Sequence, residues 1–127
     1  MTDAWGQSVP SKLTAKGAGN GNQFQAILTA DMEGFSSRLK GDEETLITVV
    51  IRSYYRFSAE MAQQFEGDLF RREGDAIWCS FTSPLKALSA GIWLVEELHR
   101  FNFQRSEGEQ IALRIGIHWG AFASESQ

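Results

Sequence analysis

The order in which strand-like and helix-like runs of apolar residues follow each other constrains the fold of this chain more than any other feature. Residues Phe24 to Ala30 form a short and nearly continuous apolar run, which is typical of a strand covered on both faces. Near the other end, apolar residues occupy every second position from Ile111 to Ile117, which is the period of a strand with one buried face. Both runs therefore predict strands.

Two longer segments between these strands show the three- and four-residue spacing of amphipathic helices. The first opens at Asp42, which can cap exposed N–H groups, and its apolar residues from Leu46 to Phe65 are expected to face the core. The second opens at Ser83-Pro84, a capping residue followed by proline at the first helical position. Its apolar residues lie on one stripe formed by Leu85, Leu88, Ile92, Val95 and Leu98.

The remaining apolar segments predict a β-hairpin. Leu69 to Arg72 and Ala76 to Phe81 flank the turn sequence Glu73-Gly74-Asp75. With a short helical stretch over residues 35–39, the predicted order is β-α-α-β-β-α-β. This order resembles a ferredoxin-like, or palm, domain of the α+β class, in which an antiparallel-rich sheet carries its long helices on one face.

The predicted elements occupy one domain over residues 23–127. Residues 1–22 combine glycine, serine and asparagine without an apolar face, and we interpret them as a flexible tail or linker. The sequence ends at Gln127, shortly after the last predicted strand and without a closing helix. We therefore expect the domain to be incomplete, truncated at its C-terminus.

Composition excludes several function classes. The 12 lysines and arginines are outnumbered by 16 aspartates and glutamates, so the basic field that attracts nucleic acid is missing and no nucleic-acid partner is expected. No apolar run approaches the roughly 20 residues of a membrane helix, and the N-terminus lacks a basic leader. Cys79 is the single cysteine, which excludes an internal disulfide and favours a small buried side chain. These features indicate a cytoplasmic protein with no membrane segment.

Two acidic residues stand where chemistry could occur. Asp31 ends the first predicted strand and precedes a tight turn, Met32 to Ser36, whose free N–H groups could bind phosphate. Asp75 lies at the hairpin tip, which a sheet of this topology can place beside the end of the first strand. Each residue alone is better explained as a helix cap or an ordinary turn residue than as a site residue. Together they indicate a Mg²⁺-dependent phosphoryl or nucleotidyl transferase, because Mg²⁺ prefers oxygen ligands.

Three segments, residues 27–36, 71–76 and 113–120, resemble in order and spacing the catalytic domain of class III adenylate/guanylate cyclases. The resemblance covers roughly residues 24–122. It implies that Asp31 and Asp75 bind two divalent ions, Mg²⁺ or Mn²⁺, with the backbone carbonyl of Met32 as a further ligand. It also implies that Gly34, Phe35 and Ser36 present backbone N–H groups to the triphosphate. The implied reaction converts ATP or GTP into a 3′,5′-cyclic nucleotide and pyrophosphate, as a step in signal transduction.

The sequence departs from the family pattern at two places. Arg71 stands at the base-selecting position, where the family typically has lysine, or glutamate in guanylate-specific members. Arginine cannot accept a hydrogen bond from a base, so the choice of nucleotide stays open, with ATP favoured over GTP. The asparagine and arginine that stabilise the transition state in the family follow the last strand and lie beyond Gln127. Because family members build the site at a dimer interface, the resemblance implies a homodimer or a partner cyclase chain. This chain would supply the metal-binding half and have little activity alone.

Two alternatives stay open. The first is a catalytically inactive cyclase-like domain that serves in dimerisation or nucleotide sensing. The second is a diguanylate cyclase palm domain, whose hairpin carries Gly-Gly-Asp/Glu-Glu-Phe where this chain has Glu73-Gly74-Asp75-Ala76. The hairpin sequence makes the second alternative the weaker one.

Overall fold

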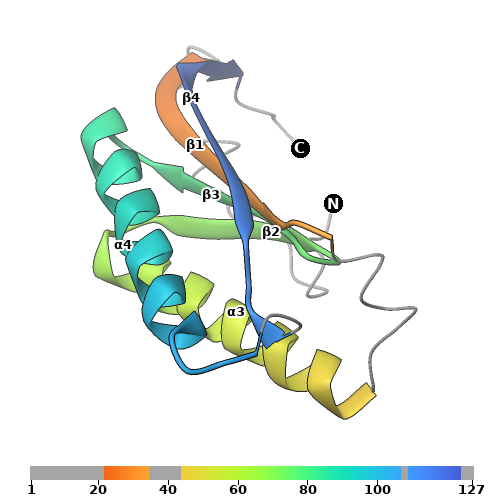
Figure 1. The fold of residues 1–127 in the computed structure, drawn as a ribbon. Coiled ribbons are helices and arrows are strands. Elements are labelled where there is room, and N and C mark those ends of the chain that lie inside the picture. Colours follow the sequence, from red (N-terminus) through yellow and green to blue (C-terminus); the bar gives the residue numbers. More distant parts are fainter. Residues whose placement is uncertain (1–21, 35–43, 107–108, 124–127) are drawn as a thin grey trace.

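The computed structural model describes residues 22–34, 44–106 and 109–123, which form a four-stranded antiparallel sheet with two long helices on one face (Figure 1). The elements are β1 (Asn22–Met32), α3 (Glu44–Gln64), β2 (Asp68–Glu73), β3 (Ala76–Phe81), α4 (Pro84–Asn102) and β4 (Leu113–Ala123). The sheet order is β2-β3-β1-β4. This arrangement confirms the predicted α+β, ferredoxin-like fold. The predicted tail, residues 1–22, lies almost entirely outside the described residues, and the short helix over 35–39 lies wholly outside them.

Strand β1 is central because it pairs with β3 on one side and with β4 on the other. Its side chains alternate between the two faces of the sheet. Ala26, Leu28 and Ala30 are fully or almost fully buried on the face that the helices cover, whereas Thr29 and Asp31 are half-buried on the opposite face. The buried run predicted for this strand is therefore correct, and its last acidic residue points away from the core.

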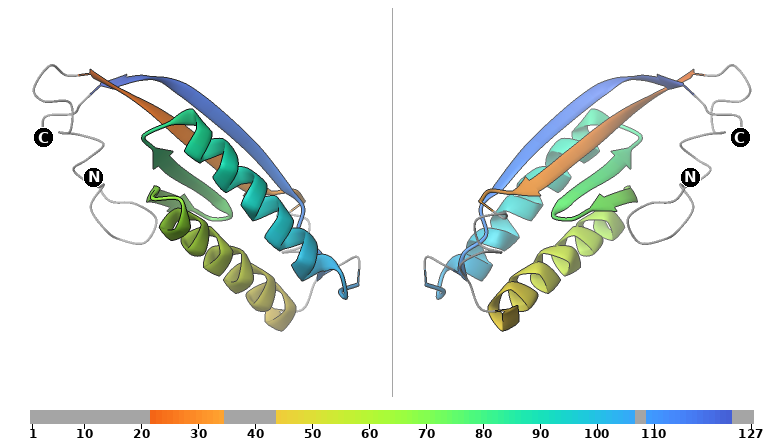
Figure 2. Two further views of the ribbon diagram at one scale, coloured as in Figure 1. Left: turned by 90° about the vertical axis from the view of Figure 1, so that its left-hand side faces the viewer. Right: turned by 90° about the vertical axis from the view of Figure 1, so that its right-hand side faces the viewer.

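The two helices lie next to each other on one face of the sheet (Figure 2). Two edge-to-face aromatic pairs join them, with ring centroids 5.8 Å apart for Phe57 and Phe101 and 6.4 Å apart for Phe65 and Trp93. On α3, Val50, Tyr54 and Met61 are buried as predicted, whereas Val49, assigned to the same core face, is 41% exposed. Neither helix among the described residues is long and apolar enough to cross a membrane.

Helix α4 begins as the sequence predicts, but a different stripe of it faces the sheet. Ser83 caps the helix, because its side-chain oxygen accepts a hydrogen bond from the backbone nitrogen of Lys86 at 3.1 Å. The stripe of large residues is mostly exposed, and of its members only Leu98 is buried. The side that packs on the sheet includes the small residues Ala87, Ala90 and Gly91. Their size lets the helix backbone approach the strands closely.

Strand β4 begins later than the alternation predicts. Ile111 is buried but precedes the strand, because the Asn102 side chain bonds both of its backbone groups. The Asn102 amide nitrogen donates to the Ile111 carbonyl at 2.8 Å, and the Ile111 nitrogen donates to the Asn102 amide oxygen at 2.7 Å. A side-chain amide thus replaces the strand partner at this position and fixes the entry of β4 at the end of α4.

Gly67, which links α3 to β2, leaves no space for a side chain. A Cβ there would lie 2.5 Å from Cε1 of Phe81 and 2.7 Å from Sγ of Cys79, and both of these residues are buried. We therefore expect Gly67→Ala to lower the free energy of unfolding by about 1–3 kcal/mol, as overpacking a core does. Gly120→Ala is the matched control, because a Cβ there meets no atom within 4 Å. Urea denaturation measures both, and equal midpoints would contradict the tight packing around Gly67.

Candidate metal and nucleotide site

Asp31 lies at the end of β1 on the sheet face opposite the helices. It is held there because its neighbours in the strand, Ala30 and Met32, are buried on the helix side. The antiparallel register of β1 and β4 places Arg114 directly opposite Asp31. The Arg114 Nε lies 3.0 Å from Asp31 Oδ1, and the two side chains are 68% and 41% exposed. The first candidate carboxylate is thus oriented by a cation from the neighbouring strand and remains accessible to solvent.

Asp75 occupies the two-residue turn that joins β2 and β3. Gly74, the first turn residue, has a φ of 59°, a conformation that glycine adopts without strain. The turn aims the Asp75 carboxylate at β1, where its Oδ2 accepts a hydrogen bond of 2.8 Å from the backbone nitrogen of Met32. The second candidate carboxylate is therefore tied to the residue that directly follows Asp31, so the hairpin tip does lie at the end of the first strand.

The charges of the two carboxylates act on a common neighbour, Tyr54. Burial raises the pKa of Tyr54 above its ordinary value, and the negative charges of Asp75 and Asp31 raise it further. Within the described part of the chain, each carboxylate accepts a hydrogen bond through one oxygen, Asp31 through Oδ1 and Asp75 through Oδ2. No group of three or more histidine, cysteine, aspartate and glutamate residues that could hold a metal occurs in this part of the chain. Two carboxylates are nevertheless a sufficient protein contribution for Mg²⁺, which takes its remaining ligands from phosphate and water.

Two consecutive tyrosines connect α3 to the candidate site. The Tyr54 hydroxyl donates a hydrogen bond of 3.2 Å to the carbonyl of Ala30, the residue before Asp31. The Tyr55 hydroxyl donates a short hydrogen bond to the carbonyl of Gly74, the residue before Asp75. The periodicity of α3 predicts a core role for Tyr54 and gives no sign of either hydroxyl contact.

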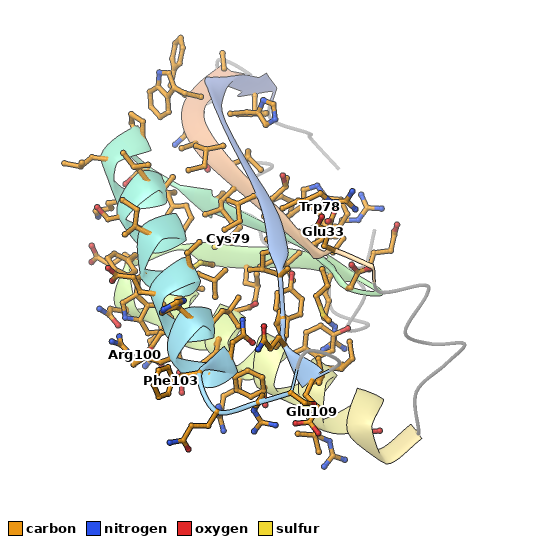
Figure 3. All side chains as sticks on the ribbon, in the orientation of Figure 1. Glu33, Trp78, Cys79, Arg100, Phe103 and Glu109 are labelled. Atoms are coloured by element: carbon orange, nitrogen blue, oxygen red, sulfur yellow. The ribbon has the colours of Figure 1, made fainter. Side chains whose placement is uncertain are left out.

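The neighbouring arginines of β2 point to opposite faces, as their adjacent positions predict. The Arg71 guanidinium lies 4.7 Å from the ring centroid of Trp78 and 2.7 Å from a carboxylate oxygen of Glu73. The Arg72 guanidinium lies on the helix side, 4.2 Å from the ring centroid of Tyr55. Figure 3 shows Trp78 on the side of the sheet away from α4 and Cys79 toward the helix, where Cys79 is fully buried. Arg71 therefore shares the face that carries Asp31.

The structure describes only part of the predicted phosphate-binding turn. Gly34 is exposed and has a φ of 72°, which ends β1 in a turn. Phe35 and Ser36 lie outside the described residues, so their predicted contacts with a triphosphate stay predictions. The side chain of Met32 is buried in the core, which leaves only its backbone groups for the site.

Sequence reasoning did not single out Arg114, although the signal for its placement was present. Arg114 belongs to the alternating run of β4, and its position predicts that it faces away from the core. The missing information was the register between β1 and β4, which pairs residues 83 positions apart. A single sequence carries no direct record of such a register.

The α+β palm fold that carries these two acidic residues is also found in known proteins, and sequence comparison finds proteins similar to the chain. No protein-family model matches the chain. The chain is 27% identical over 98 residues to "Putative adenylate cyclase 3" of Rhizobium meliloti (strain 1021), and the match covers 77% of this chain and 17% of that protein. It is 21% identical over 98 residues to "Serine/threonine-protein kinase pkn2" of Myxococcus xanthus, covering 77% of this chain and 12% of that protein.

Solved structures share the fold. The guanylyl cyclase Cya2 superimposes with a TM-score of 0.70 at 27% identity, covering 80% of this chain and 56% of that chain. The adenylate/guanylate cyclase/hydrolase from Silicibacter pomeroyi gives 0.70 at 28% identity, with 79% and 58% covered. A bacterial light-regulated adenylyl cyclase gives 0.73 at 16% identity, with 79% and 55% covered.

The described residues therefore have the fold of a class III adenylate/guanylate cyclase domain, as the sequence resemblance predicted. The chain spans little more than half the length of these solved chains, from 55% to 58%. It spans less than a fifth of each curated relative, 17% and 12%. The match thus concerns one part of a cyclase domain.

The bond between Met32 and Asp75 can be tested without any ligand. We expect Asp75→Ala to accelerate hydrogen exchange of the Met32 amide by about five- to tenfold, because that amide loses its acceptor. Asp75→Asn is the matched variant, since its side-chain oxygen can still accept and should retain most of the protection. Amide exchange followed by NMR measures both. Equal protection in the wild type and Asp75→Ala would show that the hairpin tip is not held to β1 in this way.

Proposed function

We propose that this chain carries the metal-binding half of a nucleotidyl cyclase site, which forms a 3′,5′-cyclic nucleotide and pyrophosphate at an interface between two cyclase chains. The observation that carries this proposal is the contact of the Asp75 carboxylate with the backbone of Met32, directly beside Asp31. In a fold shared with adenylyl and guanylyl cyclases, this contact brings the hairpin turn that carries Asp75 to the end of β1, where Asp31 lies. An aspartate that serves only as a turn residue or a helix cap does not require a contact with another strand beside a second aspartate.

The donor set suits Mg²⁺ or Mn²⁺. Asp31 and Asp75 each offer a carboxylate, and the Met32 carbonyl is a further candidate ligand. Bound there, two such ions would lower the pKa of the ribose 3′-hydroxyl and neutralise charge on the phosphates. Among the described residues, Arg114 contributes a positive charge beside this donor set, because its guanidinium contacts Asp31.

Adenosine triphosphate is the first substrate to test, with GTP as the alternative. The matched Rhizobium meliloti protein carries the name of an adenylate cyclase, whereas one of the solved structures is a guanylyl cyclase. Arg71, at the base-selecting position, donates hydrogen bonds and cannot accept them. Its guanidinium is already held between Trp78 and Glu73, which places it on the same face of the sheet as Asp31. This arrangement supports a role for Arg71 at the edge of a nucleotide site.

We expect Asp31→Ala and Asp75→Ala each to abolish Mn²⁺-dependent binding of ATP while the fold remains intact. Each change removes one charged ligand, and the remaining single carboxylate cannot hold the ions together with the triphosphate. Isothermal titration calorimetry of ATP with Mn²⁺ measures the binding, and circular dichroism confirms the fold. Glu60→Ala, which removes an exposed acidic side chain of α3, is the control and should bind like the wild type.

Unchanged affinity in both aspartate variants would contradict the metal site. Such a result would instead favour the alternative of a cyclase-like module that uses no metal chemistry. Loss of affinity in Glu60→Ala as well would show that general negative charge, and not the pair at the end of β1, attracts the metal nucleotide.

We further expect the 127-residue chain alone to form cyclic nucleotide slowly, at a rate lower by about 10³-fold or more than a complete cyclase site. The reason is that the proposed site forms between two cyclase chains, of which this chain supplies the metal-binding half. The measurement is the formation of cyclic AMP from ATP, or of cyclic GMP from GTP, in the presence of Mn²⁺, followed by chromatography. Rapid turnover by the purified chain without a partner would show that another residue of this chain replaces the missing cation.

A further inference from the structure

We propose that Tyr54 and Tyr55 are positioning residues, which together set the separation between the backbone segments that carry Asp31 and Asp75. The inference rests on the proposed function, because the separation matters only if the two carboxylates share a metal site. It is supported by a pair of hydrogen bonds that packing of the core does not by itself require. Two adjacent residues of α3 each use a hydroxyl to bind the carbonyl that immediately precedes one of the two carboxylates.

The Tyr54 contact fixes the β1 side of the site. Tyr54 is fully buried, and its hydroxyl donates to the Ala30 carbonyl at 3.2 Å. The peptide group that leads into Asp31 is thus held from the helix side, while the Asp31 side chain extends to the opposite face.

The Tyr55 contact fixes the hairpin side. Its hydroxyl donates to the Gly74 carbonyl, inside the two-residue turn that carries Asp75. The Arg72 guanidinium lies 4.2 Å from the centroid of the Tyr55 ring and holds the ring in place from strand β2. The peptide group that leads into Asp75 is therefore attached to the same helix as the peptide group that leads into Asp31.

The Tyr54 and Tyr55 hydrogen bonds both come from the same helix, α3. Tyr54 and Tyr55 are consecutive residues of an α-helix, and their ring centroids are 5.7 Å apart. The helix thereby fixes the distance between the two anchored carbonyls. The other link between hairpin and β1, from the Met32 nitrogen to Asp75 Oδ2, is made by the same carboxylate that would bind a metal ion in the proposed site. The tyrosine contacts use only backbone acceptors and so persist when the carboxylates bind a ligand.

The hydroxyl groups are not needed to fill the core. Phenylalanine would supply the same ring at either position. Because it has no hydroxyl, it would also avoid the cost of burying a polar group. Both hydroxyls nevertheless have carbonyl partners, and both partners adjoin a candidate metal ligand. Removing a group that orients a metal ligand typically weakens metal binding by about 10- to 100-fold. A purely structural hydroxyl would change stability without such an effect.

The test is Mn²⁺ binding to the purified chain, followed by the electron paramagnetic resonance signal of the free ion. We expect Tyr54→Phe and Tyr55→Phe each to weaken Mn²⁺ binding by about tenfold or more, while thermal unfolding stays cooperative. Ser58→Ala is the matched control. It removes a fully buried hydroxyl of the same helix that donates to the Tyr54 carbonyl at 2.8 Å and not to a carbonyl preceding Asp31 or Asp75. Its Mn²⁺ affinity should stay within about twofold of the wild type.

The outcomes separate this inference from the proposed function. Failure of the wild-type chain to bind Mn²⁺ would overturn both. Binding by the wild type, loss in Asp31→Ala, and unchanged affinity in the two tyrosine variants would overturn the positioning role alone. An equal loss in Ser58→Ala would also overturn it, because the effect would then follow general destabilisation. Tyr55 is only half-buried, so Tyr55→Phe keeps the test decisive even if Tyr54→Phe does not fold.

Discussion

The hydrogen bond from the Met32 nitrogen to the Asp75 carboxylate, 2.8 Å long, joins two parts of the chain that are 43 residues apart, and the geometry of the site depends on it. The bond is a consequence of register. Ala30 lies opposite Ile77, so continuing the antiparallel pairing by two residues brings Met32 opposite Asp75. A shift of β1 by one residue would turn Asp31 toward the helices and separate it from the hairpin. The position of the acidic pair is therefore determined by whatever fixes β1 in its register.

The core fixes that register through contacts from both helices. Leu28 is fully buried beneath α4, where a Cβ at Gly91 would lie 3.5 Å from its Cδ1. Tyr54 reaches the Ala30 carbonyl from α3. Because strand side chains alternate, every apolar side chain held against the helices directs its neighbour to the other face. The half-buried position of Asp31 is thus imposed by its buried neighbours and does not depend on a ligand.

Periodicity was sufficient to predict the strands and long helices, their order and the α+β class, because each long segment has one clear period. The acidic pair could be chosen because Asp31 ends a strand and Asp75 lies in a turn. Periodicity could not say which apolar side of α4 packs on the sheet, since the small residues around Gly91, and not the larger stripe, allow close approach. It also could not predict the Arg114 contact, which requires knowledge of a pairing across 83 residues.

The Arg114 contact places a positive charge beside Asp31, one of the two acidic residues at this end of the sheet. Like charges at one edge of a sheet repel, and a guanidinium beside Asp31 offsets part of that repulsion. The side chains of Arg114 and Asp31 are 68% and 41% exposed, so water and salt weaken their attraction. In the proposed site, a divalent ion would carry twice the charge and bind oxygen directly, and it would therefore displace such a weak partner. The backbone that carries the pair is meanwhile held by Tyr54 and Tyr55, whose contacts involve neither carboxylate.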